Sequence, residues 1–265
     1  MDASMPVDQW ITDLIYLGGN AIAWLAYLYV GARLYLLSRR TGQLPEFLIA
    51  ATFLFWMLSY LIYDIPYAIV RADALVPTFC SYASLVTLGV GNVAFAFFIR
   101  SVFRSDERWA AWLVAAIAIA DIAGIVGSAW IGDWEGINPL ANPWYWLEYF
   151  GSFAPTVWMS VEGFAQYFKM RKRLKLGLCE PIACNRFLLW GITGALWMIL
   201  ETILTANDFV NALTGQWSYL LEFFVAVFEA VPVALIWFVF FPPAFYCRWV
   251  EGGGSTETEG YPPTD

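Results

Sequence analysis

Seven long apolar stretches constrain this chain more than any other feature of its sequence, because each is long enough to cross a lipid bilayer as a helix. A spanning helix needs about 20 mostly apolar residues. The connections between the stretches are short and leave no room for a soluble domain between them. The predicted spans are Ile11–Leu37, Pro45–Val70, Val76–Phe103, Trp109–Ile131, Pro143–Phe168, Ile182–Ala206 and Trp217–Tyr246. The predicted fold is an all-α integral membrane protein, a bundle of seven transmembrane helices within residues 1–250.

The composition agrees with lipid as the main solvent. Of the 265 residues, 60% are hydrophobic and only 14% are charged, which lies outside the range of soluble globular domains. The net charge of −8 does not indicate the charge of any one surface, because acidic and basic residues are segregated along the chain. We therefore expect the lipid bilayer, and no nucleic acid, as a partner.

Basic residues predict the orientation of the bundle. Lys and Arg collect in loops on the cytoplasmic side of membrane proteins. Here they follow the first predicted span and fill the loops between the third and fourth and between the fifth and sixth, and only Arg71 falls on the other side. The residues are Arg39, Arg40, Arg100, Arg104, Arg108, the run Lys169–Lys175, and Arg186. A multi-pass protein of the cell membrane is predicted, with its N-terminus outside and its C-terminus in the cytoplasm.

Three shorter segments complete the predicted organisation. Residues 251–265 are rich in Gly, Thr, Glu and Pro, which predicts a disordered acidic cytoplasmic tail. The run Lys169–Lys175 is predicted to anchor the cytoplasmic side, with an anionic lipid or a cytoplasmic partner as further options. The pair Asn207-Asp208 is typical of a loop and is expected to end the sixth span.

Seven carboxylates fall inside the predicted spans, where each costs about 2.5–3.5 kcal/mol at the helix centre. No Lys or Arg lies at comparable depth, so no buried salt bridge is expected to neutralise them. Depth along each helix places six in the outer half of the bundle, and Glu162 alone toward the cytoplasm. The seven are Asp64, Asp121, Glu148, Glu162, Glu201, Glu222 and Glu229.

Aromatic residues accompany these acids at helical spacing. Tyr60 lies one turn from Asp64, and Trp197 lies one turn from Glu201. An outward-facing polar cavity would accommodate them, with Asp121 and Glu229 nearest the midplane. The predicted ligand-binding residues are Asp64, Asp121, Glu201, Glu229, Tyr60 and Trp197.

A more ordinary reading exists for several of the polar residues. Glu148 and Glu222 are close enough to the membrane surface to be simply solvated. Asn20 and Asn92 are residues of a type that more often joins helices than binds ligands.

Metal and retinal sites are not expected. The sequence has no His, and Cys179 and Cys184 lack the second pair of ligands that a zinc site requires. The layout is similar to that of rhodopsins and of G-protein-coupled receptors, but in layout only. Retinal would need a Lys in the last span, and residues 220–245 contain none, so no retinal Schiff base is expected. The identity of any other cofactor stays open.

These observations favour a membrane protein that binds or senses a small molecule or cation, as a sensor or a permeation protein. The alternative is a membrane-embedded isomerase or cyclase, in which Asp121 or Glu229 protonates an apolar lipid or isoprenoid. Carboxylic acids between aromatic walls suit that chemistry, whereas the absence of His removes most hydrolytic mechanisms. Whether the protein is an enzyme stays open, as do its ligand and oligomeric state.

Overall fold

The computed structural model describes residues 7–69, 75–132, 138–216 and 218–252, and side chains within them except those of residues 7–17, 64–69, 75–77 and 219. These residues form eight α-helices and no strand. In chain order they are α1 (Val7–Thr41), α2 (Leu44–Ile69), α3 (Leu75–Phe103), α4 (Arg108–Ile131), α5 (Tyr145–Leu174), α6 (Pro181–Thr214), α7 (Tyr219–Phe240) and α8 (Ala244–Gly252). The predicted acidic tail lies outside the described residues.

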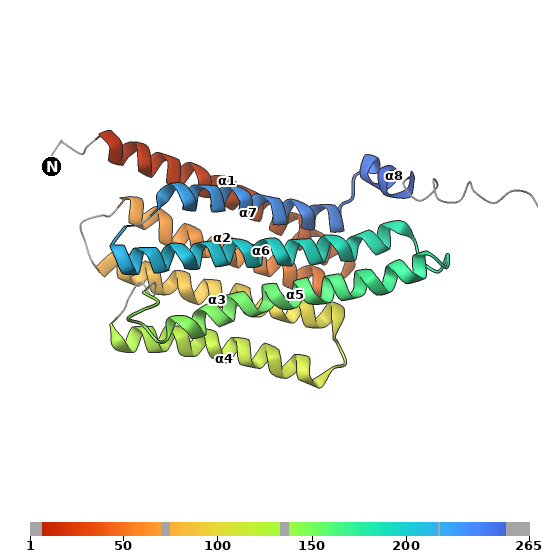
Figure 1. The fold of residues 1–265 in the computed structure, drawn as a ribbon, viewed down its shortest axis with the longest axis horizontal. Helices are drawn as coiled ribbons and strands as arrows, with labels where there is room; N and C mark the ends of the chain where they lie inside the picture. Colours follow the sequence, from red (N-terminus) through yellow and green to blue (C-terminus); the bar gives the residue numbers. More distant parts are fainter. Residues whose placement is uncertain (1–6, 70–74, 133–137, 217, 253–265) are drawn as a thin grey trace, which may run out of the picture.

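Six of the described helices contain segments long and apolar enough to cross a membrane, so the chain has the architecture of a multi-pass helical membrane protein. The segments are Gly18–Thr41, Leu44–Tyr63, Thr78–Phe103, Arg108–Ile131, Pro181–Thr214 and Leu220–Phe240. The helix α5 is not among them; it carries Glu148 in its first turn and Arg171, Lys172 and Arg173 in its last turn. It nevertheless runs the length of the bundle beside α4 and α6 (Figure 1).

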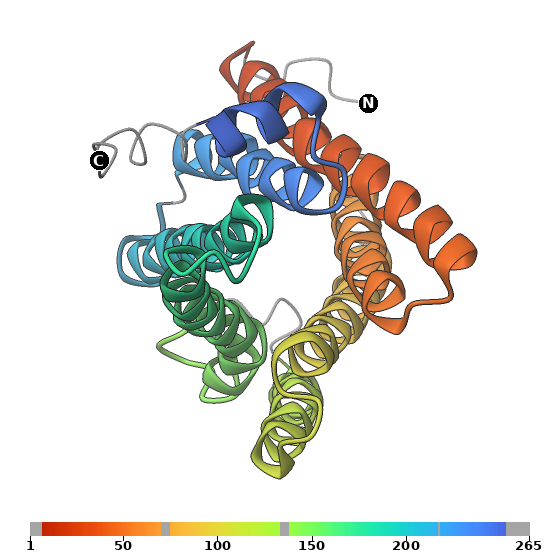
Figure 2. The same ribbon diagram turned by 90° about the vertical axis from the view of Figure 1, so that its right-hand side faces the viewer.

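The long helices form a ring in chain order. Each of α1 to α6 contacts the next helix, α7 returns to α1, and α3 also contacts α5. The end view in Figure 2 shows this order, with α4 at the periphery and α8 beside the end of α7. Side chains from α1, α2, α3, α5, α6 and α7 can therefore meet inside one ring.

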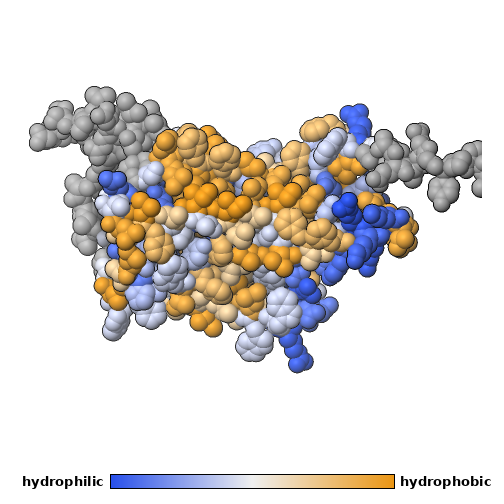
Figure 3. All heavy atoms as spheres, viewed as in Figure 1, coloured by the Kyte–Doolittle hydropathy of each residue, from blue (hydrophilic) through white to orange (hydrophobic). Residues whose placement is uncertain are grey.

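Basic residues mark one end of the bundle, which we call the basic end. Arg39 and Arg40 lie in the last turn of α1, and Arg171, Lys172 and Arg173 lie in the last turn of α5. Figure 3 shows hydrophilic residues gathered at this end, next to a broad apolar surface over the middle of the molecule.

Two helix ends differ from the sequence-based prediction. The helix α6 continues through Asn207 and Asp208 to Thr214, so the loop predicted there is wrong, and the helix ends at Gly215 with φ +68°. Glycine adopts this left-handed conformation without steric cost, and its N–H bonds Asn211 O. The last predicted span is divided, because Pro242 and Pro243 cannot donate backbone hydrogen bonds and separate α7 from α8.

Glycines let α5 and α6 approach closely. A Cβ atom on Gly194 would lie 2.5 Å from the backbone nitrogen of Ser160, and one on Gly163 would lie 2.3 Å from that of Gly191. Small residues at helix contacts allow such approach in membranes, where packing rather than the hydrophobic effect holds helices together. This contact fixes the spacing between the two helices that supply most of the site described below.

A cluster of aromatic side chains fills the centre of the ring. Trp197 of α6 packs edge-on against Trp56 of α2 at 5.3 Å and Phe95 of α3 at 5.5 Å between ring centroids. Phe53 joins the cluster 6.0 Å from Trp197, and Phe53 and Phe95 are fully buried. Edge-to-face pairs of this kind add stability beyond the area they bury.

Candidate functional site

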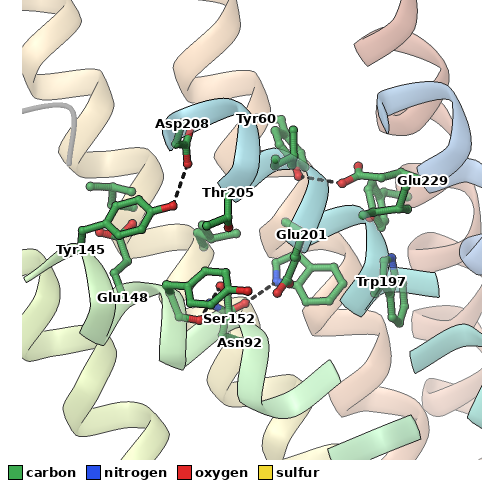
Figure 4. A pocket seen from close by; sticks show the side chains of 17 residues that line it. Tyr60, Asn92, Tyr145, Glu148, Ser152, Trp197, Glu201, Thr205, Asp208 and Glu229 are labelled. Carbon is green, nitrogen blue, oxygen red and sulfur yellow. Dashed lines mark hydrogen bonds between the residues drawn. The ribbon is translucent and has the colours of Figure 1, made fainter. Parts of the chain in front are cut away.

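A cavity of about 240 Å³ opens above the aromatic cluster, in the half of the bundle away from the basic end. Six helices line it, and α4 is the long helix that does not. Figure 4 shows the cavity from close by. The lining residues are Tyr27 of α1; Trp56 and Tyr60 of α2; Leu85, Leu88 and Asn92 of α3; Tyr145, Glu148, Tyr149 and Ser152 of α5; Trp197, Leu200, Glu201, Leu204, Thr205 and Asp208 of α6; and Glu229 of α7.

Helical spacing explains why α6 contributes so much of this lining. Trp197, Glu201, Thr205 and Asp208 recur at intervals of three or four residues, so they share one face of the helix. Residues 145, 148, 149 and 152 follow the same spacing along the first two turns of α5. The two polar faces meet because the glycine contact described above holds α5 against α6.

One side of the cavity joins Glu201 and Glu229 to aromatic residues (Figure 4). Tyr60 OH donates a hydrogen bond to Glu229 Oε1 at 3.3 Å. Glu201 Oε2 is buried and has no hydrogen-bond partner among the described residues. The Trp197 side chain, only 3% exposed, interacts with the side chain of Tyr27. Buried polar groups are nearly always hydrogen-bonded in folded proteins, so Glu201 Oε2 marks a place where a further group can bind.

The other side of the cavity holds a second pair of acids. Tyr145 OH donates a hydrogen bond to Asp208 Oδ2 at 2.8 Å, which joins α5 to α6. Glu148 extends from α5 toward the same region, and Thr205 lies between this side and Glu201 (Figure 4). The four carboxylates that line the cavity are Glu148, Glu201, Asp208 and Glu229. None of the residues that line it in the described part of the chain is Lys or Arg.

The structure brings together four of the six predicted ligand-binding residues: Tyr60, Trp197, Glu201 and Glu229. The Asp64 side chain lies outside the described residues. Asp121 is buried, at 3% exposure, but it does not line the cavity.

Asp121 instead packs between α3, α4 and α5. A Cβ atom on Gly151 of α5 would lie 1.7 Å from Asp121 Oδ1, so that glycine makes the space for the carboxyl group. Asp121 interacts with the side chain of Asn92, and Asn92 Oδ1 accepts a hydrogen bond from Trp56 Nε1 at 3.0 Å. Since Trp56 and Asn92 line the cavity, Asp121 lies one residue behind its wall.

Asp208 is the site residue that the sequence reasoning missed. It was assigned to a loop, although its distance of seven residues from Glu201 is the spacing of one helix face. Glu148, for which simple solvation was an alternative, lines the cavity together with Asn92.

The expectation that no carboxylate in a span is paired with a base is wrong for Glu162. Arg104 Nε donates to Glu162 Oε1 at 2.7 Å, and the Glu162 side chain is 5% exposed. The Arg104 guanidinium also lies 5.7 Å from the centre of the Trp109 ring. The hydrogen bond to Glu162 raises the pKa of Arg104. This pair lies near the basic end and belongs to the framework, not to the cavity.

Two further observations bear on ligands. Within the described residues, no group of three or more His, Cys, Asp or Glu side chains is close enough to hold a metal ion. A second cavity of about 160 Å³ adjoins the first and shares Tyr60, Leu204 and Glu229 with it. Its lining also includes Glu222, whose carboxylate therefore lies close to the site.

A comparison with protein families, with curated proteins and with solved structures finds no match to this chain. The class of protein therefore follows from the fold alone, and it is a multi-pass helical membrane protein.

Proposed function

We propose that this protein binds a small molecule or a cation in the cavity between α1, α2, α3, α5, α6 and α7. Glu201 carries the proposal, because its Oε2 is buried, lies in the cavity lining and has no hydrogen-bond partner among the described residues. A buried carboxyl group of this kind is stabilised by a proton or by a bound cation. By the orientation that the basic residues favour, the cavity faces the outer side of the cell membrane.

Binding or sensing is favoured over permeation. The aromatic cluster of Phe53, Trp56, Phe95 and Trp197 lies directly below the cavity and fills the centre of the ring. A ligand that enters the cavity meets two of these rings, because Trp56 and Trp197 belong to its lining. A bound ligand would thus contact Trp56 of α2 and Trp197 of α6, whose rings pack against each other and against Phe95 of α3.

The isomerase or cyclase alternative fits the site less well. Its two candidate acids were Asp121 and Glu229, and only Glu229 lines the cavity. Protonation of an alkene also needs an apolar lining around the acid, whereas Glu229 lies beside the hydroxyl group of Tyr60. We therefore place ligand binding first.

The test is thermal unfolding of the purified full chain in detergent, with and without amines, metal ions and lipids. A ligand that binds the folded state raises the unfolding temperature, and titrating this rise gives an apparent affinity. Glu201→Gln should lower that affinity at least tenfold. Glu251→Gln is the control, because Glu251 is exposed and lies in α8, far from the cavity. If every ligand acts equally on the parent chain and on Glu201→Gln, the cavity is not the binding site.

A further inference from the structure

Three aromatic side chains that line the cavity use their hydrogen-bond donors within the protein. Trp56 Nε1 donates to Asn92 Oδ1 at 3.0 Å, and Tyr60 OH donates to Glu229 Oε1 at 3.3 Å. Tyr145 OH likewise donates to a carboxylate of α6 at 2.8 Å. These residues therefore offer a ligand ring surface rather than donors, and aromatic rings attract cations.

The four carboxylates of the lining differ as acceptors (Figure 4). Tyrosine hydroxyl groups donate to Glu229 and to Asp208, and Glu148 also has a partner. Glu201 differs from them, because its side chain is half-buried in the cavity lining and its Oε2 has no hydrogen-bond partner in the described part of the chain. Burial of such an oxygen is costly, so a bound proton or a donor from the cavity has to compensate it.

The surroundings of Glu201 favour an organic cation over a metal ion. A calcium ion usually takes about six to eight oxygen ligands. Among the side chains that the structure describes, no group of three or more His, Cys, Asp or Glu could hold a metal ion. An ammonium group needs fewer acceptors and is also attracted by the ring of Trp197, one helical turn from Glu201. Glu229 interacts electrostatically with Glu201, so negative charge on it adds to the attraction for a cation.

The rest of the lining limits the size of the ligand. The cavity of about 240 Å³ lies below the range of about 300–1,000 Å³ that is typical of pockets for drug-sized molecules. Aliphatic side chains from α3 and α6 line it together with the aromatic rings, namely Leu85, Leu88, Leu200 and Leu204. A small apolar body, such as a single ring, suits this surface.

Building on the function proposed above, we propose that the ligand is a small primary amine, with its ammonium group at Glu201 and its apolar body against Trp56 and Trp197. A primary ammonium group supplies three N–H donors, whereas Glu201 supplies an acceptor that the protein leaves open. Hydrogen bonds between an ammonium group and a carboxylate are stronger than those between neutral groups.

The experiment compares three ligands that share one carbon skeleton: 2-phenylethylamine, its N,N,N-trimethyl derivative and 2-phenylethanol. They carry a cation with N–H donors, a cation without them and a neutral hydroxyl group. Affinities are taken from thermal-shift titrations of the purified full chain in detergent. The amine should bind at least tenfold tighter than each of the other two. Glu201→Gln should remove this advantage while the affinity of the alcohol changes less than threefold, and Glu251→Gln, the exposed control, should preserve it.

The outcomes separate the class of ligand from the binding function. An alcohol or a trimethyl derivative that binds as tightly as the amine overturns the primary amine, while dependence of that binding on Glu201 supports the binding function. An advantage of the amine that survives in Glu201→Gln also overturns it, because the ammonium group then lies elsewhere. If none of the three binds, the amine proposal fails alone, and the panel of metal ions and lipids decides the binding function. The comparison on the unmodified chain does not depend on the folding of any variant.

Discussion

At the scale of single residues, burial divides the acids of this protein into three kinds. Glu201 and Glu229 line a cavity, Asp121 is enclosed by α3, α4 and α5, and Glu162 is paired with Arg104. A charge inside a membrane is tolerated when it faces a cavity, shares a proton or has a partner. The three kinds should therefore respond differently to replacement.

The first contrast is between Glu229 and Asp121. Glu229→Gln should lower ligand affinity at least tenfold, because it removes a carboxylate from the cavity lining. Asp121→Asn should lower it less than threefold, since Asp121 acts only through Asn92. Both replacements keep the shape of the side chain, so thermal stability without ligand should change little. Ligand titrations on the two purified variants check this, and equal losses would mean that Asp121 reaches the ligand directly.

The ion pair gives a second prediction. Arg104→Met should lower the free energy of unfolding by about 1–3 kcal/mol, because it leaves the buried Glu162 carboxylate without its hydrogen-bond donor. Ligand affinity should not change. Denaturant or thermal unfolding of the purified protein measures the loss, with the exposed Arg108→Met as the matched control. In the Glu162→Met background, Arg104→Met should lower the free energy of unfolding much less. An equal loss in that background would mean that the loss comes from the contact between Arg104 and Trp109.

At the scale of helices, the number of apolar residues predicts the elements well and their ends less well. The sequence predicts that the sixth span ends at Ala206, because Asn and Asp at the next two positions favour loops. In the structure Asn207 is 2% exposed, and its side chain accepts a hydrogen bond from the backbone N–H of Ser218 at 3.3 Å. That contact crosses from α6 to the start of α7, so no local pattern reveals it. The missed extension is also why Asp208 was not recognised as a site residue.

The contact between α5 and α6 gives a third prediction. Gly194→Ala should destabilise the bundle by about 1–3 kcal/mol, because its Cβ atom would lie 2.5 Å from Ser160 N and 2.8 Å from Thr156 O. Gly18→Ala is the control, since nothing lies within 4 Å of its Cβ and alanine favours a helix. Thermal unfolding of both variants checks the difference. A Gly194→Ala protein as stable as the parent would mean that the two helices separate at little cost.

At the scale of the whole molecule, depth can be read from a membrane sequence, whereas direction around the helix axis cannot. The sequence predicts that Asp121 and Glu201 both lie in the outer half of the bundle and belong to one cavity, and only Glu201 lines it. The ring order puts α4 outside the lining, so Asp121 faces α3 and α5 instead. Arg104 follows α3 in the sequence, yet it reaches Glu162, which is 58 residues away in α5. Both results depend on how helices are rotated and tilted, which only tertiary packing decides.

The orientation of the bundle gives the last prediction, and α5 is its critical element. With 30 residues, α5 is about 45 Å long, enough to cross the hydrocarbon core of about 30 Å, although it is not among the apolar segments. If α5 crosses, residues 136 and 177 on either side of it lie on opposite faces of the membrane. Alkaline phosphatase, which is active outside, should report at Gly136, and a cytoplasmic fluorescent protein should report at Gly177 and after Glu251. Gly177 lies in an open turn that tolerates insertion, and Gly136 lies outside the described residues. The same reporter active at both glycines would leave six spans, and reversed activities would turn the cavity toward the cytoplasm.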